Sequence, residues 1–167
     1  MLRSVFMLKR VLQKAMFAAG CFWGVEAAFR KSKGVTSTLV GYTGGLTENP
    51  MYEQVCTGAT KHAEAVQITY DPAAISYEEL LEIFWSIHNP TTMNRQGPDI
   101  GSQYRSAIFY NTEAQKQAAE KSKKELVQKG IYKQPIVTEI TKADEFYKAE
   151  EYHQQYLQKR NKGSCHI

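Results

Sequence analysis

The order of apolar patterns over residues 14–70 limits the fold more than any other feature of this sequence. Residues 14–20 form a short apolar run typical of a buried strand, and residues 22–31 carry apolar side chains at helical spacing. Two further strands are predicted at 35–42 and 62–70, with a turn-rich loop and no helix between them. Strands that follow one another directly, and strands separated by a helix, together favour a mixed sheet. We therefore expect an α+β fold of two layers, with helices packed on one mixed β-sheet.

The second half of the chain continues this alternation. A helix is predicted at 76–88, and it opens with a capping box of Ser76 and Glu79. A strand at 104–110, a helix at 112–129, a strand at 134–140 and an amphipathic helix at 144–160 follow in order. The polar loops 43–61 and 89–101 are longer than a connection requires. They are therefore candidates to carry a functional site.

Length and composition bound the class of protein. A chain of 167 residues suits one domain, and 43% hydrophobic with 23% charged residues excludes wholesale disorder and fibrous repeats. We expect an extension at 1–13, one catalytic domain at 14–160 and a flexible tail at 161–167. The formal net charge of +4 is too small to require a nucleic acid or a membrane as partner, and we expect a monomer.

The N-terminal segment is expected to be a plain extension and not a targeting signal. Basic residues near the start resemble a transit peptide, and residues 18–21 resemble a lipoprotein cleavage box, but Lys9, Arg10 and Lys14 interrupt the apolar run that such signals need. The most apolar stretch, 16–29, contains Glu26 and is shorter than the roughly 20 residues of a spanning helix. Three cysteines without scaffold spacing favour a reducing compartment, so we expect a cytoplasmic location.

Cys21 is the first candidate for chemistry. It lies between Gly20 and Phe22, where a predicted strand gives way to a predicted helix. A helix N-terminus presents unpaired N–H groups and partial positive charge, which favour a thiolate and make a better nucleophile. Phe22 and Trp23 would then wall an apolar pocket beside the thiol. A small buried cysteine among core aromatics explains the position equally well.

Glu64 is the second candidate. In an alternating strand it shares a face with Val66, Ile68 and Tyr70, so its carboxyl group is expected to be partly buried. Burial raises the pKa of a carboxylic acid, which then holds a proton that it can donate. An acid near a strand end that reaches solvent or pairs with Lys61 is the alternative.

The long loops and the tail supply the remaining candidates. Tyr52, Asp99 and Tyr104 lie on or beside the loops, and phenols are good donors to a developing oxyanion, although position alone favours an ordinary core or surface role for each. Cys165 follows a basic tail segment, where an exposed thiol suits a resolving role better than packing. Cys56 has no neighbouring charge and is expected to be structural. Metal-ligand spacings, phosphate loops and dinucleotide fingerprints are absent from the sequence, so we expect no metal and no cofactor.

Several segments together resemble one family. Gly20-Cys21-Phe22-Trp23-Gly24 is similar to the signature of the A-type peptide methionine sulfoxide reductases, and further matching segments follow in order at 41–45, 49–55, 57–58, 62–66, 88–92, 94–97, 99–101, 103–106 and 149–154. The resemblance covers roughly residue 15 to the tail. Departures are few: residues 1–13 carry no motif, and Met51 stands where a smaller polar residue is usual, which would alter the pocket rim.

The resemblance implies a fold, a reaction and residue roles. It implies a two-layer α+β domain with a ferredoxin-like core, and reduction of the S epimer of methionine sulfoxide, free or in proteins, in the repair of oxidative damage. By motif, Cys21 is the nucleophile and Glu64 the acid; the tail thiol Cys165 resolves the sulfenic acid as a disulfide, which thioredoxin or a similar dithiol reduces. The substrate-binding residues implied are Phe22, Trp23, Tyr52, Asp99 and Tyr104.

Two other functions stay open on the residues alone. A thiol peroxidase also forms a sulfenic acid at an activated cysteine, and its substrate would be a peroxide. A ferredoxin-like core with a positive net charge also suits an RNA-binding module, although no segment carries the basic-aromatic strand pattern of such modules.

Overall fold

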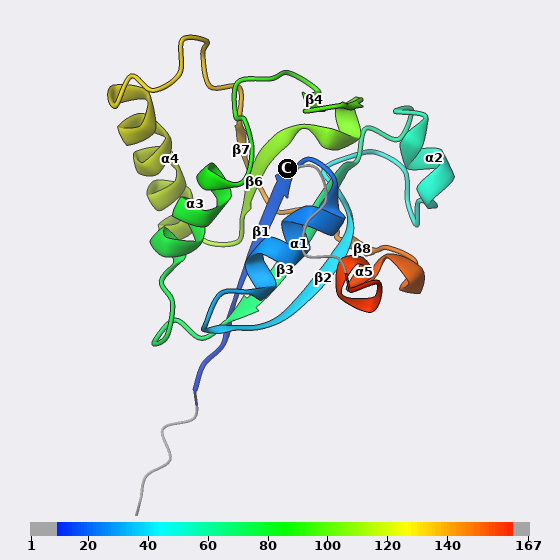
Figure 1. Cartoon of the computed structure of the whole chain (residues 1–167), viewed down its shortest axis with the longest axis horizontal. Coiled ribbons are helices and arrows are strands. Elements are labelled where there is room, and N and C mark those ends of the chain that lie inside the picture. The colour runs from blue at the N-terminus through cyan, green and yellow to red at the C-terminus, as the bar shows by residue number, and fades with distance from the viewer. Residues whose placement is uncertain (1–9, 162–167) are drawn as a thin grey trace, which may run out of the picture.

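A computed structural model describes residues 10–161 as one α+β domain built on a mixed sheet (Figure 1). The strand order is β7-β6-β1-β3-β2-β8, and β6 and β7 run parallel whereas the other neighbouring pairs are antiparallel. The six strands are β1 (Gln13–Ala19), β2 (Val35–Thr43), β3 (Ala63–Tyr70), β6 (Ser106–Tyr110), β7 (Glu139–Lys142) and β8 (Tyr147–Lys148). The expected α+β class with a mixed sheet is confirmed.

Helices cover one face of this sheet and short elements surround one end of it (Figure 1). The helices are α1 (Phe22–Arg30), α2 (Tyr52–Cys56), α3 (Tyr77–Ser86), α4 (Glu113–Gln128) and α5 (Tyr156–Lys159). A small hairpin of β4 (Arg95–Gln96) and β5 (Asp99–Ile100) and two 3-10 turns, η1 (Ser102–Tyr104) and η2 (Glu151–His153), complete the fold. The long loops thus contain α2 and the hairpin, which the sequence patterns did not predict.

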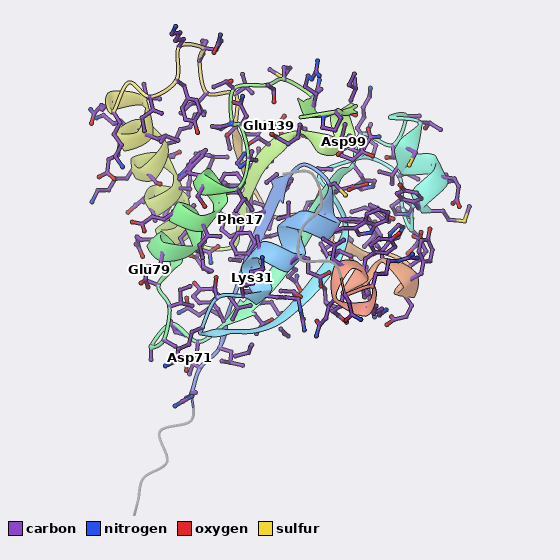
Figure 2. All side chains as sticks on the ribbon, in the orientation of Figure 1. Phe17, Lys31, Asp71, Glu79, Asp99 and Glu139 are labelled. Carbon is purple, nitrogen blue, oxygen red and sulfur yellow. The ribbon has the colours of Figure 1, made fainter. Side chains whose placement is uncertain are left out.

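The alternation in β3 sets the two faces of the sheet. Val66, Ile68 and Tyr70 belong to the main core with α1, α3 and α4, whereas Ala63 and Ala65 face a smaller cluster on the other side. Phe17 lies near the centre of the main core, where its ring stacks on Phe29 and Phe84 at 5.3 and 5.2 Å between centroids (Figure 2). The capping box of Ser76 and Glu79 is present as predicted.

The predicted helix at 144–160 is wrong. This segment instead lies along the free edge of β2: β8 pairs with β2, and the Ala149 amide donates to the Val40 carbonyl. The buried Gln154 side chain continues the pairing, because its amide group accepts from Val40 N and donates to Val40 O, both at 2.9 Å. Only residues 156–159 are α-helical, and Gln155 before them has a left-handed φ of 48°. The hydrogen bonds that pair the free edge of β2 therefore outweigh the helical spacing of the apolar residues in this segment.

Two smaller predictions need correction. The strand expected at 134–140 begins only at Glu139, because the preceding backbone turns to pair with the loop, where the Val137 amide donates to the Pro90 carbonyl. The first strand begins at Gln13 rather than residue 14. Within residues 10–161, none of the helices is long and apolar enough to cross a membrane.

Candidate active site

Cys21 occupies the turn between β1 and α1, as expected. It is the N-cap residue of α1 and is partly exposed. Gly20 makes this turn possible, since its φ is +97° and a Cβ there would lie 2.8 Å from the Cβ of Gln96. Gln96 is itself fixed to the Asn89 backbone by two amide hydrogen bonds. The β4–β5 hairpin therefore packs directly against the turn that presents the thiol.

Glu64 lies beside this turn and is 2% exposed. Its Oε2 accepts a hydrogen bond from Phe22 N at 3.1 Å, which places the carboxyl group next to the residue that follows Cys21. Burial raises the pKa of Glu64 to about 8, the Phe22 amide opposes this shift, and the nearby Asp99 charge adds to it. The acid is therefore largely protonated at neutral pH. The alternative of a solvent-exposed Glu64 is wrong.

Tyr52 and Tyr104 approach the same acid from two different elements, α2 and η1. Burial raises the pKa of both phenols, and the Glu64 charge raises it further in both cases. Tyr104 also experiences the charges of Asp99 and Cys21. Asp99 lies on the hairpin (Figure 2). The structure thus brings Cys21, Glu64, Tyr52, Tyr104 and Asp99 together, and both phenols keep the protons that they would donate.

The aromatic pair after Cys21 has two different environments. Phe22 is 1% exposed and packs on Tyr42 and His153, with ring centroids 5.8 and 5.1 Å away. Trp23 is only partly buried, and its indole stacks on the Tyr156 ring. The Trp23 indole N–H donates to His153 Nδ1 at 2.9 Å. Burial lowers the pKa of His153, which keeps the imidazole neutral and able to accept this bond.

His153 is a site residue that the sequence patterns misplaced. It falls in the segment 144–160 that the sequence predicts as a helix, but it lies on η2, with its ring centroid 4.5 Å from that of Tyr52. Tyr42 is a second site residue that the sequence patterns did not single out. It lies opposite Glu64 in the pairing of β2 with β3, and its hydroxyl donates to Glu150 at 3.3 Å. Its position in a segment that matches the family was the available signal.

The other two cysteines differ from each other. Cys56 ends α2 with an exposed side chain, and its thiol forms a hydrogen bond with Tyr52, so its structural role stays a prediction. Cys165 lies outside the described residues. Among the described residues, no three histidine, cysteine or acidic side chains gather as metal ligands would.

These contacts define a class of protein. A cysteine at a helix N-terminus, beside a protonated acid and two phenols, is the arrangement of a thiol enzyme that acts on a group with an acceptor oxygen.

Comparison with known proteins identifies the family. The sequence profile of the family described as peptide methionine sulfoxide reductase matches residues 13–167. The peptide methionine sulfoxide reductase MsrA of Methanosarcina acetivorans is 62% identical over 149 residues, which are 89% of this chain and 79% of the relative. That of Methanothermobacter thermautotrophicus is 58% identical over 155 residues, covering 93% of this chain and 92% of the relative. The chain belongs to the peptide methionine sulfoxide reductase family.

Solved structures agree with this assignment. Reduced Mxr1 of Saccharomyces cerevisiae superimposes with a TM-score of 0.86 at 39% identity, covering 93% of this chain and 89% of that one. Mxr1 in complex with Trx2 matches with a TM-score of 0.63 at 29% identity, over 90% and 91% of the two chains. The protein is therefore an oxidoreductase that reduces methionine sulfoxide, and neither the peroxidase nor the RNA-binding alternative is needed to explain its site.

Proposed function

We propose that this enzyme reduces the S epimer of methionine sulfoxide, free or in proteins, through a sulfenic acid on Cys21. The observation that carries the proposal is the hydrogen bond from Phe22 N to Glu64 Oε2, because it holds a protonatable acid next to the nucleophile. Repair of oxidised proteins follows from the activity of the family.

Activation of the substrate is the first chemical problem. A sulfoxide sulfur is a poor electrophile until its oxygen is hydrogen-bonded or protonated. Glu64, with its raised pKa, supplies a proton, while Tyr52 and Tyr104 donate to the oxygen as charge develops on it. The Cys21 thiolate then attacks sulfur, the S–O bond of the substrate breaks as its protonated oxygen passes to Cys21, and methionine leaves while Cys21 becomes a sulfenic acid. Asp99 belongs to the same polar network through its effect on Glu64 and Tyr104.

Regeneration needs a second thiol. Cys165 attacks the Cys21 sulfenic acid, water leaves and a disulfide forms. Mxr1 has been crystallised with Trx2, which supports thioredoxin or a similar dithiol protein as the reductant of that disulfide in this chain as well. The chemistry we propose uses the protein's own thiols and acid, without a metal or an organic cofactor.

The remaining expectations belong to this proposal. The order β6-β1-β3-β2, with α1 and α3 as the connecting helices, supports the expected ferredoxin-like core. The domain limits, the monomeric state and the cytoplasmic location stay predictions.

An assay on resolved epimers tests the proposal. Dithiothreitol-driven reduction of methionine (S)-sulfoxide and methionine (R)-sulfoxide should give methionine from the S epimer, and no reaction of comparable rate from the R epimer. Hydrogen peroxide as the only oxidant is the matched control, and faster turnover of peroxide than of the S epimer would contradict the proposal.

A further inference from the structure

Three side chains form a continuous stack at the edge of the site. The Trp23 indole lies on the Tyr156 ring, with centroids 3.7 Å apart and planes at 7°. The Arg160 guanidinium carbon lies over the same ring, 4.2 Å from its centroid. Two groups this close to one centroid cannot share a face, so Arg160 covers the face of Tyr156 that is opposite to Trp23. The stack therefore runs from the candidate pocket wall to the end of α5.

Other contacts hold α5 in place as well, and Gln155, the residue before the helix, donates two hydrogen bonds to Glu26. The helix is a single turn, and helices this short are unstable without tertiary contacts. Leu157 is buried, Gln158 accepts from Arg30 Nε at 3.1 Å, and Lys159 Nζ donates to the Glu151 carbonyl at 3.1 Å. Removal of one contact is therefore expected to loosen the end of this helix.

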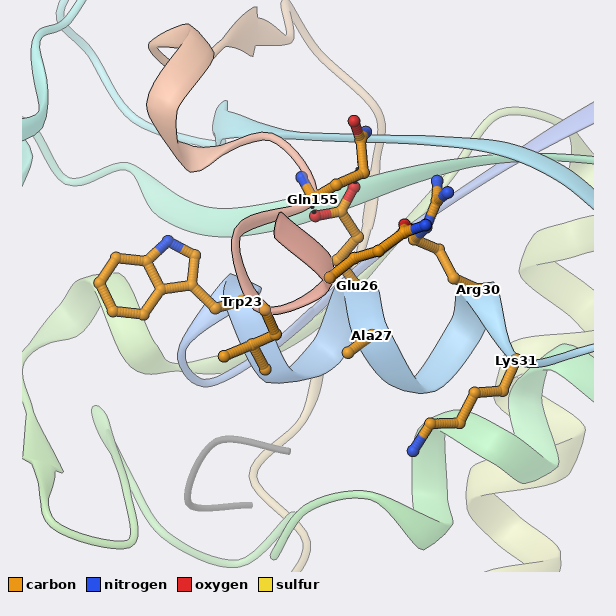
Figure 3. A pocket seen from close by; sticks show the side chains of 8 residues that line it. Trp23, Glu26, Ala27, Arg30, Lys31 and Gln155 are labelled. Carbon is orange, nitrogen blue, oxygen red and sulfur yellow. Dashed lines mark hydrogen bonds between the residues drawn. The ribbon is translucent and has the colours of Figure 1, made fainter. Parts of the chain in front are cut away.

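A hollow of about 280 Å³ separates α5 from part of α1 (Figure 3). It is lined by Trp23, Glu26, Ala27, Arg30, Lys31, Gln155, Leu157 and Gln158. Hydrogen bonds from Gln155 to Glu26 hold the start of α5 on α1 beside this hollow, and the stack on Trp23 ties Tyr156 and Arg160 to the residues around Cys21.

The position of α5 determines where the last part of the chain begins. Cys165 follows Asn161 by four residues, which span at most roughly 14 Å when extended. Trp23, at the other end of the stack, is two residues from Cys21. When the end of α5 is fixed, the short segment that follows it keeps the effective concentration of the Cys165 thiol at Cys21 high. When the end of α5 is loosened, this effective concentration falls.

We propose that Arg160 is a positioning residue for disulfide closure. It holds Tyr156 against Trp23 and so fixes the end of α5, from which the terminal segment starts, relative to the turn that carries Cys21. The inference rests on the proposed function, in which the Cys165 sulfur forms a bond to the Cys21 sulfur and the sulfenic hydroxyl leaves as water. Arg160 makes and breaks no bond in this step. Trp23 retains its hydrogen bond to His153 without Arg160, so the earlier attack on the sulfoxide should change little.

Single-turnover kinetics separate the two steps. With methionine (S)-sulfoxide and no external reductant, quenched samples give methionine release for the first step, and mass spectrometry after alkylation gives disulfide formation for the second. In Arg160→Ala, methionine release should stay within about twofold of the wild type, while closure slows by about two- to fivefold, the range that an exposed cation–π contact supports. Lys133→Ala removes the same charge from an exposed loop position, and should keep both wild-type rates.

A second variant distinguishes stacking from charge. Arg160→Lys keeps the charge but loses the planar group that stacks on an aromatic face, so its closure rate should lie between those of Arg160→Ala and the wild type. Full rescue by lysine would assign the effect to charge and contradict the stack.

The remaining outcomes separate the inference from the proposed function. A wild-type closure rate in Arg160→Ala, or an equal slowing of both steps, overturns the inference and leaves the proposed function intact. A Cys21 disulfide that still forms in Cys165→Ser overturns the resolving role of Cys165, and the inference with it.

Discussion

Glu64 accepts a hydrogen bond from the backbone amide of Phe22, the residue that follows Cys21. One contact thus connects the start of β3 to the first turn of α1 and places an acid beside a nucleophile. Burial raises the pKa of Glu64 and so favours the protonated acid, and the hydrogen bond from the Phe22 amide offsets only part of this shift. A group in this position can donate a proton at neutral pH without leaving the core.

The first prediction concerns the proton donor. Glu64→Gln should lower the rate of methionine release by about 10²–10⁴-fold, because an amide keeps the shape of the side chain but cannot deliver the proton. Tyr52→Phe and Tyr104→Phe should each cost much less, since the other phenol still holds the oxygen. Single-turnover release of methionine measures all three variants. A Glu64→Gln enzyme within a few fold of the wild type would place the acid elsewhere.

The second prediction concerns the pH dependence of the same step. The raised pKa of Glu64, about 8, means that the acid is protonated below this pH and ionised above it. The first-step rate in the wild type should therefore fall as the pH rises through about 8. This alkaline limb should be missing from Glu64→Gln. An alkaline limb of equal size in both proteins would contradict the role of Glu64.

The third prediction concerns stability. The pKa of Glu64 is raised from 4.5 to about 8 in the folded protein, so the protonated acid favours folding at low pH and this contribution is lost as the pH rises through that window. Glu64→Gln carries no such loss. Its thermal midpoint should exceed that of the wild type by a margin that grows between pH 4.5 and 8. A margin that shrinks with rising pH would show that Glu64 is ionised in the folded state.

The fourth prediction concerns the edge of β2. Gln154→Leu should lower the free energy of unfolding by about 1–3 kcal/mol, because Val40 N would lose its partner inside the protein and Val40 O would keep only the Ala149 amide. Gln117→Leu, on the exposed surface of α4, is the matched control and should stay within about 0.5 kcal/mol of the wild type. Denaturant titration measures both, and equal stabilities would mean that water replaces the Gln154 amide.

The sequence predicted the elements whose pattern is local. Alternation in residues 62–70 identified β3 and the face that carries Glu64, and the Ser76–Glu79 box located the start of α3. The position of Cys21 at the head of α1 followed from the change of pattern at Gly20. These predictions needed only the spacing of apolar residues, one capping box and one glycine.

Long-range contacts were beyond such reasoning. Apolar residues in 144–160 do recur at helical spacing. However, Gln154 forms a hydrogen bond with Val40, 114 positions away in the sequence, and this contact holds the segment along the edge of the sheet. The five-residue helix α2 is too short for periodicity to reveal. Tyr52 and Asp99 became firm candidates only through the family resemblance, and the contact of His153 with Trp23 came only from the structure.

The central claim is that Cys21 attacks the sulfoxide and Cys165 closes the disulfide. The most direct measurement counts the methionine released per enzyme from the S epimer without reductant, and maps the disulfides in the same samples. Wild type and Cys165→Ser should each release about one methionine, with a Cys21–Cys165 disulfide in the first and a Cys21 sulfenic acid in the second. Cys21→Ser should release none. Methionine from Cys21→Ser would contradict the attack, and a Cys21–Cys56 disulfide with normal thioredoxin-driven recycling of Cys165→Ser would make Cys56 the resolving thiol.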